Sequence, residues 1–148
     1  MVDLFTALAF EQDRMWLGGR DGLYYSDDFG ATAVKLLEGE VTAILLDGGN
    51  RMILGGKKIQ YSVSGGPFRD AWTGGAPLLV RSLLRSGASL YAGTSRGVLR
   101  STDDGASWLD FSSETSDLDV VSLSSDRESL YVGTKQCGVY ELALPSDG

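Results

Sequence analysis

The sequence predicts an all-β protein made of four copies of one small β-sheet. A short segment ending in glycine recurs along the 148 residues, with its glycines at positions 18, 55, 93 and 133, which are 37, 38 and 40 residues apart. A fixed period of this length indicates a propeller or solenoid repeat. Each copy contains short runs rich in β-branched and aromatic residues between Gly, Asp and Ser turns. No copy contains a helical stripe, so we expect a β-propeller rather than a helical solenoid.

The repeat divides the chain into units of about 38 residues, spanning approximately 3–40, 41–77, 78–117 and 118–148. Four strands, A to D, are expected in each unit. The expected A strands cover residues 6–10, 41–46, 80–84 and 120–124, and the B strands cover 15–19, 52–56, 90–94 and 130–134. The C strands cover 22–26, 58–62, 97–101 and 138–142, and D strands are expected at 33–37, 69–72 and 108–111. The fourth unit lacks room for a D strand, so the last blade is expected to be incomplete.

An incomplete last blade leaves three ways to close the ring. The four units could close as a four-bladed ring, or two chains could form an eight-bladed ring about a two-fold axis. The missing blades could also lie on a different chain. Because open sheet edges promote association, we expect a homodimer or completion by another chain.

Composition excludes several classes of function. The chain has 13 Lys and Arg against 20 Asp and Glu, a net charge of −7, which disfavours binding to nucleic acid or to anionic membranes. It has no histidine and one cysteine, Cys137, which excludes His-based catalysis, thiolate or imidazole zinc sites and an intrachain disulfide. No cofactor or metal is expected. No apolar run is long enough to span a membrane and no signal peptide is evident, so we expect no membrane insertion and a cytoplasmic location.

A turn motif recurs after the C strands. Residues 101–108 read S-x-D-x-G-x-x-W, and two weaker copies begin at Ser26 and Ser62. We interpret Asp103 as an acceptor for turn amides one or two residues ahead, Gly105 as a position with positive φ, and Trp108 as a lid over the hairpin. The motif residues in the three copies are Ser26, Asp28 and Gly30; Ser62 and Gly66; and Ser101, Asp103, Gly105 and Trp108. In the second copy Ser64 replaces the Asp and Arg69 takes the Trp position, whereas Ala33 takes it in the first copy.

The motif resembles the Asp-box of the sialidase-type (BNR) β-propeller repeat family. The resemblance covers the whole chain through the repeat and implies a propeller in which these boxes are structural turns on the face away from the usual ligand site. Sialidases of this architecture also need an arginine cluster and a tyrosine nucleophile in recognisable segments. No such segment stands in this sequence, so we predict that the chain is not an enzyme.

Basic residues recur in the turns between the B and C strands, one position in every unit. In a propeller these turns share one face, so the cations should converge opposite the boxes, where they are either solvated or bound to an acidic partner surface. They are Arg20, Lys57, Lys58, Arg96 and Lys135. We predict a protein-binding or scaffold module that uses this face. A carbohydrate-binding module is the alternative, and a fragment or relative of a sialidase-type glycosidase is the third reading.

Overall fold

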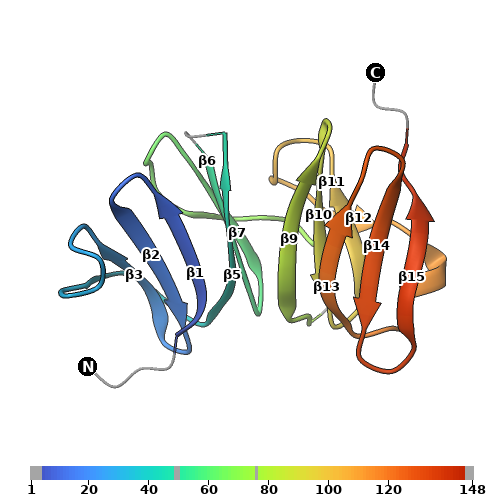
Figure 1. Cartoon of the computed structure of the whole chain (residues 1–148), viewed down its shortest axis with the longest axis horizontal. Helices are drawn as coiled ribbons and strands as arrows, with labels where there is room; N and C mark the ends of the chain where they lie inside the picture. The colour runs from blue at the N-terminus through green and yellow to red at the C-terminus, as the bar shows by residue number, and fades with distance from the viewer. Residues whose placement is uncertain (1–4, 49–50, 76, 146–148) are drawn as a thin grey trace.

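The computed structural model describes residues 5–48, 51–75 and 77–145, and these form four antiparallel sheets (Figure 1). The predicted all-β fold of four blades is confirmed. Blade 1 contains β1 (Phe5–Glu11), β2 (Arg14–Gly19), β3 (Gly22–Ser26) and β4 (Val34–Glu38), and blade 2 contains β5 (Val41–Asp47), β6 (Arg51–Gly56), β7 (Ile59–Val63) and β8 (Arg69–Asp70). Blade 3 contains β9 (Val80–Ser86), β10 (Ser89–Thr94), β11 (Gly97–Ser101) and β12 (Leu109–Asp110), and blade 4 contains β13 (Val120–Ser125), β14 (Ser129–Thr134) and β15 (Gly138–Ala143).

The outermost strands differ most from the sequence expectation. The expected D strands at 69–72 and 108–111 shrink to the two-residue strands β8 and β12, although β4 keeps five residues. Trp72 leaves its own blade and forms an isolated parallel bridge with Ser107 of blade 3. In the described part of blade 4, the sheet ends at β15, followed by no fourth strand. A 3-10 turn, η1 (Ser113–Thr115), lies in the connection from blade 3 to blade 4.

The four blades form an open arc rather than a closed ring. Strand β1 packs beside β5, β5 beside β9, and β9 beside β13. Figure 1 shows blade 1 (blue) at the left end and blade 4 (red) at the right end, with blades 2 and 3 between them. Over the residues that the structure describes, β1 and β13 do not pack side by side as the A strands of neighbouring blades do, so the described residues do not form a closed four-bladed ring.

Each pair of neighbouring blades buries one apolar cluster between them. We call the side of a blade that meets the preceding blade its receiving face, and the side that meets the next blade its leading face. Trp16 and Leu23 on the leading face of blade 1 pack with Val41 and Leu54 on the receiving face of blade 2. Tyr91 and other residues of blade 3 pack against blade 4 in the same way. Blade-to-blade packing of this kind, rather than any one sheet, forms the core.

A valine against a glycine recurs at every blade junction. A Cβ added to Gly18 would lie 2.7 Å from Val41 Cγ1, and one added to Gly55 would lie 2.4 Å from Val80 Cγ1. The third junction repeats the contact between Gly93 and Val120, again at 2.7 Å. The recurring glycines at the ends of the B strands are therefore required by packing, because only a residue without a side chain admits the next blade so closely.

Candidate functional site

The box turn of blade 3, residues 101–108, is held by hydrogen bonds that its own side chains make. Ser101 Oγ accepts from the amide of Gly105 at 2.9 Å and donates to Asp103 Oδ1 at 2.8 Å. Asp103 Oδ1 in turn accepts from the amide of Ser107 at 2.9 Å. Asp103 was expected to reach amides one or two residues ahead. It reaches four residues ahead because Asp104 and Gly105, both with positive φ, curl the turn back.

The box turn of blade 1 repeats this network without the tryptophan. Ser26 Oγ accepts from the amide of Gly30 at 2.9 Å, and Asp28 Oδ1 accepts from the amide of Thr32 at 2.8 Å. The hydrogen bonds from the Thr32 hydroxyl and amide and from Ser26 lower the pKa of Asp28 to about 2. For Asp103, burial alone would raise the pKa, but hydrogen bonds from Ser107 and Ser101 outweigh it and the pKa is lowered.

The box turn of blade 2 is one residue shorter, which changes the sequence alignment. Tyr61 pairs with Arg69 as Arg100 of blade 3 pairs with Leu109, so Phe68, not Arg69, stands where Trp108 stands. Phe68 packs into the cluster between blades 1 and 2. By the same register the positive-φ Gly65 (72°), rather than Gly66, matches Gly105 (100°). Ser62 donates to the carbonyl of Gly66 at 2.7 Å, and no aspartate organises the turn.

The indole of Trp108 closes the junction between blades 2 and 3. Its side chain is 1% exposed and packs with Ile53 and Leu90, and its Nε1 donates to the carbonyl of Gly105 at 2.9 Å. On the same edge, Arg85 donates to Asp47 at 2.7 Å and to Asp104 at 3.0 Å, so the box turn is also tied to blade 2 by charge.

A groove stands at the junction of blades 1 and 2, where the smaller Phe68 replaces the indole. Its volume is about 480 Å³, and Trp16, Leu46, Met52 and Phe68 form an apolar floor. The rim is polar and carries Glu11, Arg14, Arg51, Ser62 and Ser64. The Arg14 guanidinium lies 5.6 Å from the Trp16 ring centroid and pairs with Glu11 at 2.8 Å.

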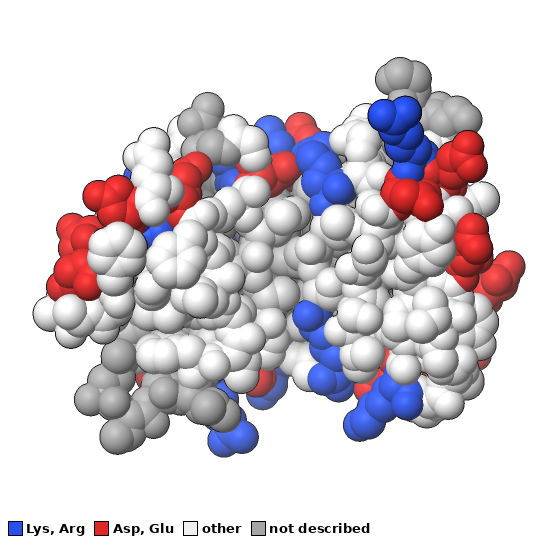
Figure 2. All heavy atoms as spheres, viewed as in Figure 1, with Lys and Arg blue, Asp and Glu red and all other residues white. Residues whose placement is uncertain are grey.

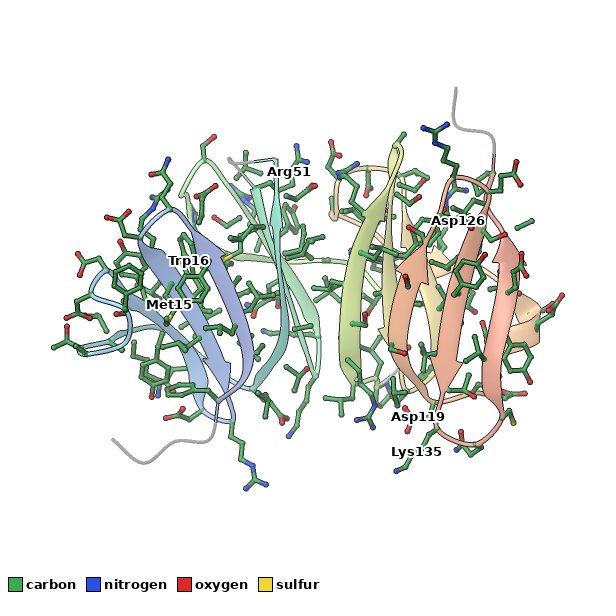
Figure 3. All side chains as sticks on the ribbon, viewed as in Figure 1. Met15, Trp16, Arg51, Asp119, Asp126 and Lys135 are labelled. Atoms are coloured by element: carbon green, nitrogen blue, oxygen red, sulfur yellow. The ribbon has the colours of Figure 1, made fainter. Side chains whose placement is uncertain are left out.

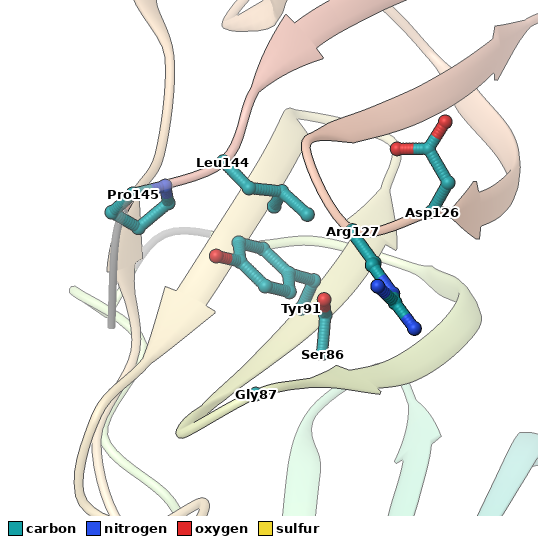
Figure 4. A pocket seen from close by; sticks show the side chains of 7 residues that line it. All are labelled: Ser86, Gly87, Tyr91, Asp126, Arg127, Leu144 and Pro145. Atoms are coloured by element: carbon teal, nitrogen blue, oxygen red, sulfur yellow. The ribbon is translucent and has the colours of Figure 1, made fainter. Parts of the chain in front are cut away.

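A second groove, of about 540 Å³, stands at the junction of blades 3 and 4, where the box has been lost (Figure 4). In place of a box turn, Leu142 and Leu144 pack into the cluster between these two blades. Tyr91 lies in the groove between Leu144 and Ser86, with Arg127 at the rim (Figure 4). The intact box therefore fills its junction, whereas the shortened and the missing box each leave a hollow.

The turns between B and C strands position the predicted cations at the opposite edge. In blade 3 the Thr94 hydroxyl accepts from the amide of Arg96 at 3.0 Å and donates to the carbonyl of Gly97 at 2.8 Å. In blade 4, Thr134 makes the matching bonds to the amide of Cys137 and the carbonyl of Gly138. These tight turns project Arg96 and Lys135 into solvent, and Arg20, Lys57 and Lys58 are exposed in the corresponding turns of blades 1 and 2.

Lys58 differs from the other basic residues because it pairs with Asp70 at 3.1 Å. Within the part of the chain that the structure describes, no ion pair involves Arg20, Lys57, Arg96 or Lys135. Figure 3 shows Lys135 and Asp119 at the lower edge and Arg51 and Asp126 at the upper edge. In Figure 2, Lys and Arg side chains stand along the lower edge and also along the upper edge, while Asp and Glu gather at the upper left and far right. We call the lower edge, which carries these four unpaired cations, the basic-turn edge.

Two absences hold for the described residues. No group of three or more acidic or cysteine side chains there is placed to hold a metal ion. No helix within residues 5–48, 51–75 and 77–145 is long and apolar enough to cross a membrane.

No family model matches the sequence, and no curated protein does. Among solved structures, the computationally designed Ika4 protein superposes with a TM-score of 0.75 at 19% identity, over 98% of this chain and 94% of that one. YCF48 bound to D1 peptide superposes with a TM-score of 0.64 at 17% identity, over 93% of this chain and 48% of that one. An ancestral GH74 enzyme superposes with a TM-score of 0.71 at 15% identity, over 90% of this chain and 22% of that one. The chain has a β-propeller fold. It spans about half of YCF48 and under a quarter of the GH74 enzyme, so these similarities concern the fold alone.

Proposed function

We propose that this four-bladed chain is a non-enzymatic protein-binding module of the Asp-box repeat type, which holds an acidic partner on its basic-turn edge. The observation that carries the proposal is the recurrence of one solvated cation at the same turn of each blade, in a chain whose net charge is −7. An ammonium or guanidinium group without a partner in the chain is available to a carboxylate of another protein. Because these cations recur at the same turn of each blade, they form an extended binding surface rather than one isolated charge.

Three acidic residues near these turns already have basic partners. Asp70 forms an ion pair with Lys58, Asp119 with Arg81 at 3.0 Å, and Asp21 with Lys35 at 3.3 Å. Because the charges of these three carboxylates are already balanced by their partners, they offset little of the positive charge of the four unpaired cations. Exposed pairs are individually weak, about 0.2–1 kcal/mol each, so the edge would act through several contacts at once.

The experiment measures binding of a labelled polyglutamate peptide as a probe for an acidic surface. Reversing Arg20, Lys57, Arg96 and Lys135 to Glu should abolish binding, and each single reversal should weaken it by about two- to fivefold. Binding of the wild-type protein should also fade as salt is raised. Arg127→Glu is the matched control, because Arg127 is equally exposed but lies by the groove at the opposite edge. Binding that survives the fourfold reversal, or no binding by the wild type, would overturn the proposal.

The groove between blades 1 and 2 favours carbohydrate binding as a second candidate function. Its volume of about 480 Å³ lies in the range of small-molecule sites, and it combines an aromatic floor with charged rim groups. Trp16 is 8% exposed and its ring lies beneath Arg14, so the groups available to a ligand are the polar ones at the rim, where Arg14 and Glu11 can bind sugar hydroxyl groups.

A glycan array followed by calorimetry on any hit tests this candidate. Arg14→Ala and Glu11→Ala should each remove the binding of that glycan, because each deletes a charged group at the rim of the groove. Val63→Asp serves as the control, since Val63 is exposed on the same blade edge but does not line the groove. A protein that binds no glycan on the array, or a hit that is unaffected by both rim variants, would reject the candidate.

A further inference from the structure

The receiving face of blade 1 repeats the packing face of blade 2 position by position. In blade 2, Ile44 pairs with Leu54 and Leu46 pairs with Met52, and these four side chains pack against blade 1. In blade 1, the pairs Leu8–Leu17 and Phe10–Met15 hold the same places in the register. Among the described residues no other blade packs on these pairs. Leu8 is 55% and Phe10 is 49% exposed, whereas Met15 is buried beside Gly30 of its own box turn.

The other end of the arc carries the matching half of a junction. On the leading face of blade 4, Tyr131 and Val139 hold the places of Trp16 and Leu23 in blade 1. Val139 is 72% exposed, and Val121, at the bulge of β13, is 41% exposed. Gly133 holds the place of the three glycines that admit a valine at the internal junctions.

The residue that would enter this place from another blade 1 is Phe5. It occupies the register position of Val41, which Gly18 admits at the first junction. Each end of the chain therefore presents one half of a contact that the chain itself makes three times. An exposed apolar sheet face of this kind marks an interaction site, and the complementary surface is the leading face of blade 4.

We propose that two copies of this chain join end to end into a two-fold ring of eight blades. Blade 4 of each copy packs its leading face on blade 1 of the other, so that one rotation satisfies both open ends. Ring closure also ends the association at two chains, because no free blade face is left to recruit a third. The proposal does not rest on the basic-turn edge, because Leu8 and Val139 lie on blade faces, whereas the cations lie on turns.

The experiment measures the mass of the full chain in solution at micromolar concentration by light scattering. The wild type should have twice the 15.8 kDa mass of one chain. Leu8→Asp and Val139→Asp should each give monomers, because each would bury an unpaired carboxylate at both junctions of the ring. Val63→Asp is the matched control, with 52% exposure on a surface outside both junctions, and should remain a dimer.

Mixing the two monomeric variants distinguishes this ring from other dimers. The Leu8→Asp chain keeps an intact blade 4 and the Val139→Asp chain keeps an intact blade 1, so one wild-type junction can form between them. The mixture should therefore recover a dimer, weaker than that of the wild type, that neither variant forms alone. Circular dichroism verifies that each variant is folded, and if Leu8→Asp is not, Val139→Asp together with the control decides.

Three results would overturn the proposal. The first is a wild-type chain that stays monomeric, which would leave the end faces to a different partner chain. The second is a mass that grows beyond two chains, which would show that the ends join without closing a ring. The third is a dimer that survives both substitutions, or variants that fail to associate on mixing, because either would place the contact on another surface.

Discussion

The indole Nε1 of Trp108 donates a 2.9 Å hydrogen bond to the carbonyl of Gly105, within the same turn. This bond satisfies the polar atom of a side chain that is otherwise buried against blade 2. The ring can therefore fill the junction between blades 2 and 3 at no cost in unpaired polar groups. The box turn thus acts as a wedge between blades, in addition to closing its own hairpin.

We expect Trp108→Ala to lower the free energy of unfolding by about 3–5 kcal/mol, as for large-to-small changes in a core. Trp108→Phe should cost less, because blade 2 already uses Phe68 in this position. Urea denaturation checks both values. A cost below about 1 kcal/mol for the alanine variant would show that the indole does not bear on the junction.

The carboxylate of Asp28 should make the free energy of unfolding depend on pH. Its pKa in the folded protein is about 2, below the ordinary value of 3.8, because Thr32 and Ser26 donate hydrogen bonds to the charged form. A lowered folded-state pKa means that the stabilisation is fully present above the unfolded value and is lost as pH falls from about 4 toward about 2. Urea midpoints measured across this range should fall for the wild type.

Asp28→Asn is the control for this pH dependence. The amide cannot ionise, so the variant should be less stable near neutral pH and should lose less stability on acidification. Asp103, whose pKa is also lowered, remains and should supply part of the residual slope. Equal slopes for the wild type and Asp28→Asn would contradict the assignment to Asp28.

Charge also joins blades 2 and 3 across their junction. The Asp47 side chain is 5% exposed and accepts from Arg85 of blade 3 and from Arg51 of its own blade. The hydrogen bond from Arg85 lowers the pKa of Asp47, although burial opposes it, and Arg51 adds to the lowering. Removing Asp47 would leave Arg51 and Arg85 with the more exposed Asp104 as their partner.

We therefore expect Asp47→Ala to cost about 1–3 kcal/mol in the free energy of unfolding, because the two arginines lose their buried partner but keep Asp104. Asp104→Ala, which removes a more exposed partner of the same arginines, should cost less than about 1 kcal/mol. Thermal and urea unfolding provide the measurement. If both substitutions lowered the free energy of unfolding equally, the burial of Asp47 would not explain the contribution of its ion pairs to stability.

The strands and their order follow from the repeat, because alternating apolar residues and glycine-ended runs specify a sheet locally. Contacts between blades are less evident in the sequence, but the residues that meet are one repeat period apart. Arg85 reaches Asp47, Arg81 reaches Asp119, and Thr42 donates to the carbonyl of Val80, each across 38 positions. Searching for opposite charges one period apart would have found the two ion pairs.

Two features could not be read from the sequence. Phe68 was missed because the second box turn is one residue shorter, and matching letters placed Arg69 and Gly66 in positions that the strand register assigns to Phe68 and Gly65. The grooves were missed because a hollow depends on which neighbouring side chains are too small to fill it. Whether a hollow remains is decided by how two blades pack together, and no single sequence motif records it.

Close packing at the blade junctions provides the last prediction. A Cβ on Gly55 would lie 2.4 Å from Val80 Cγ1 and 2.7 Å from Val80 Cβ, too close for either atom to move aside without shifting a strand. We expect Gly55→Ala to cost about 1–3 kcal/mol in the free energy of unfolding, as overpacking does. Val80→Ala in the same chain should recover part of that cost, although alone it destabilises by leaving a cavity.

Gly133→Ala is the matched change at a glycine that receives no valine from within the chain. Its added Cβ would meet the Ser122 hydroxyl at 2.3 Å, and a serine side chain can rotate away, so the cost to a single chain should be smaller than at Gly55. Calorimetric unfolding of both variants, with the double variant at positions 55 and 80, measures the difference. Equal losses at Gly55 and Gly133, with no recovery in the double variant, would mean that the glycines serve backbone conformation rather than the close approach of the next blade.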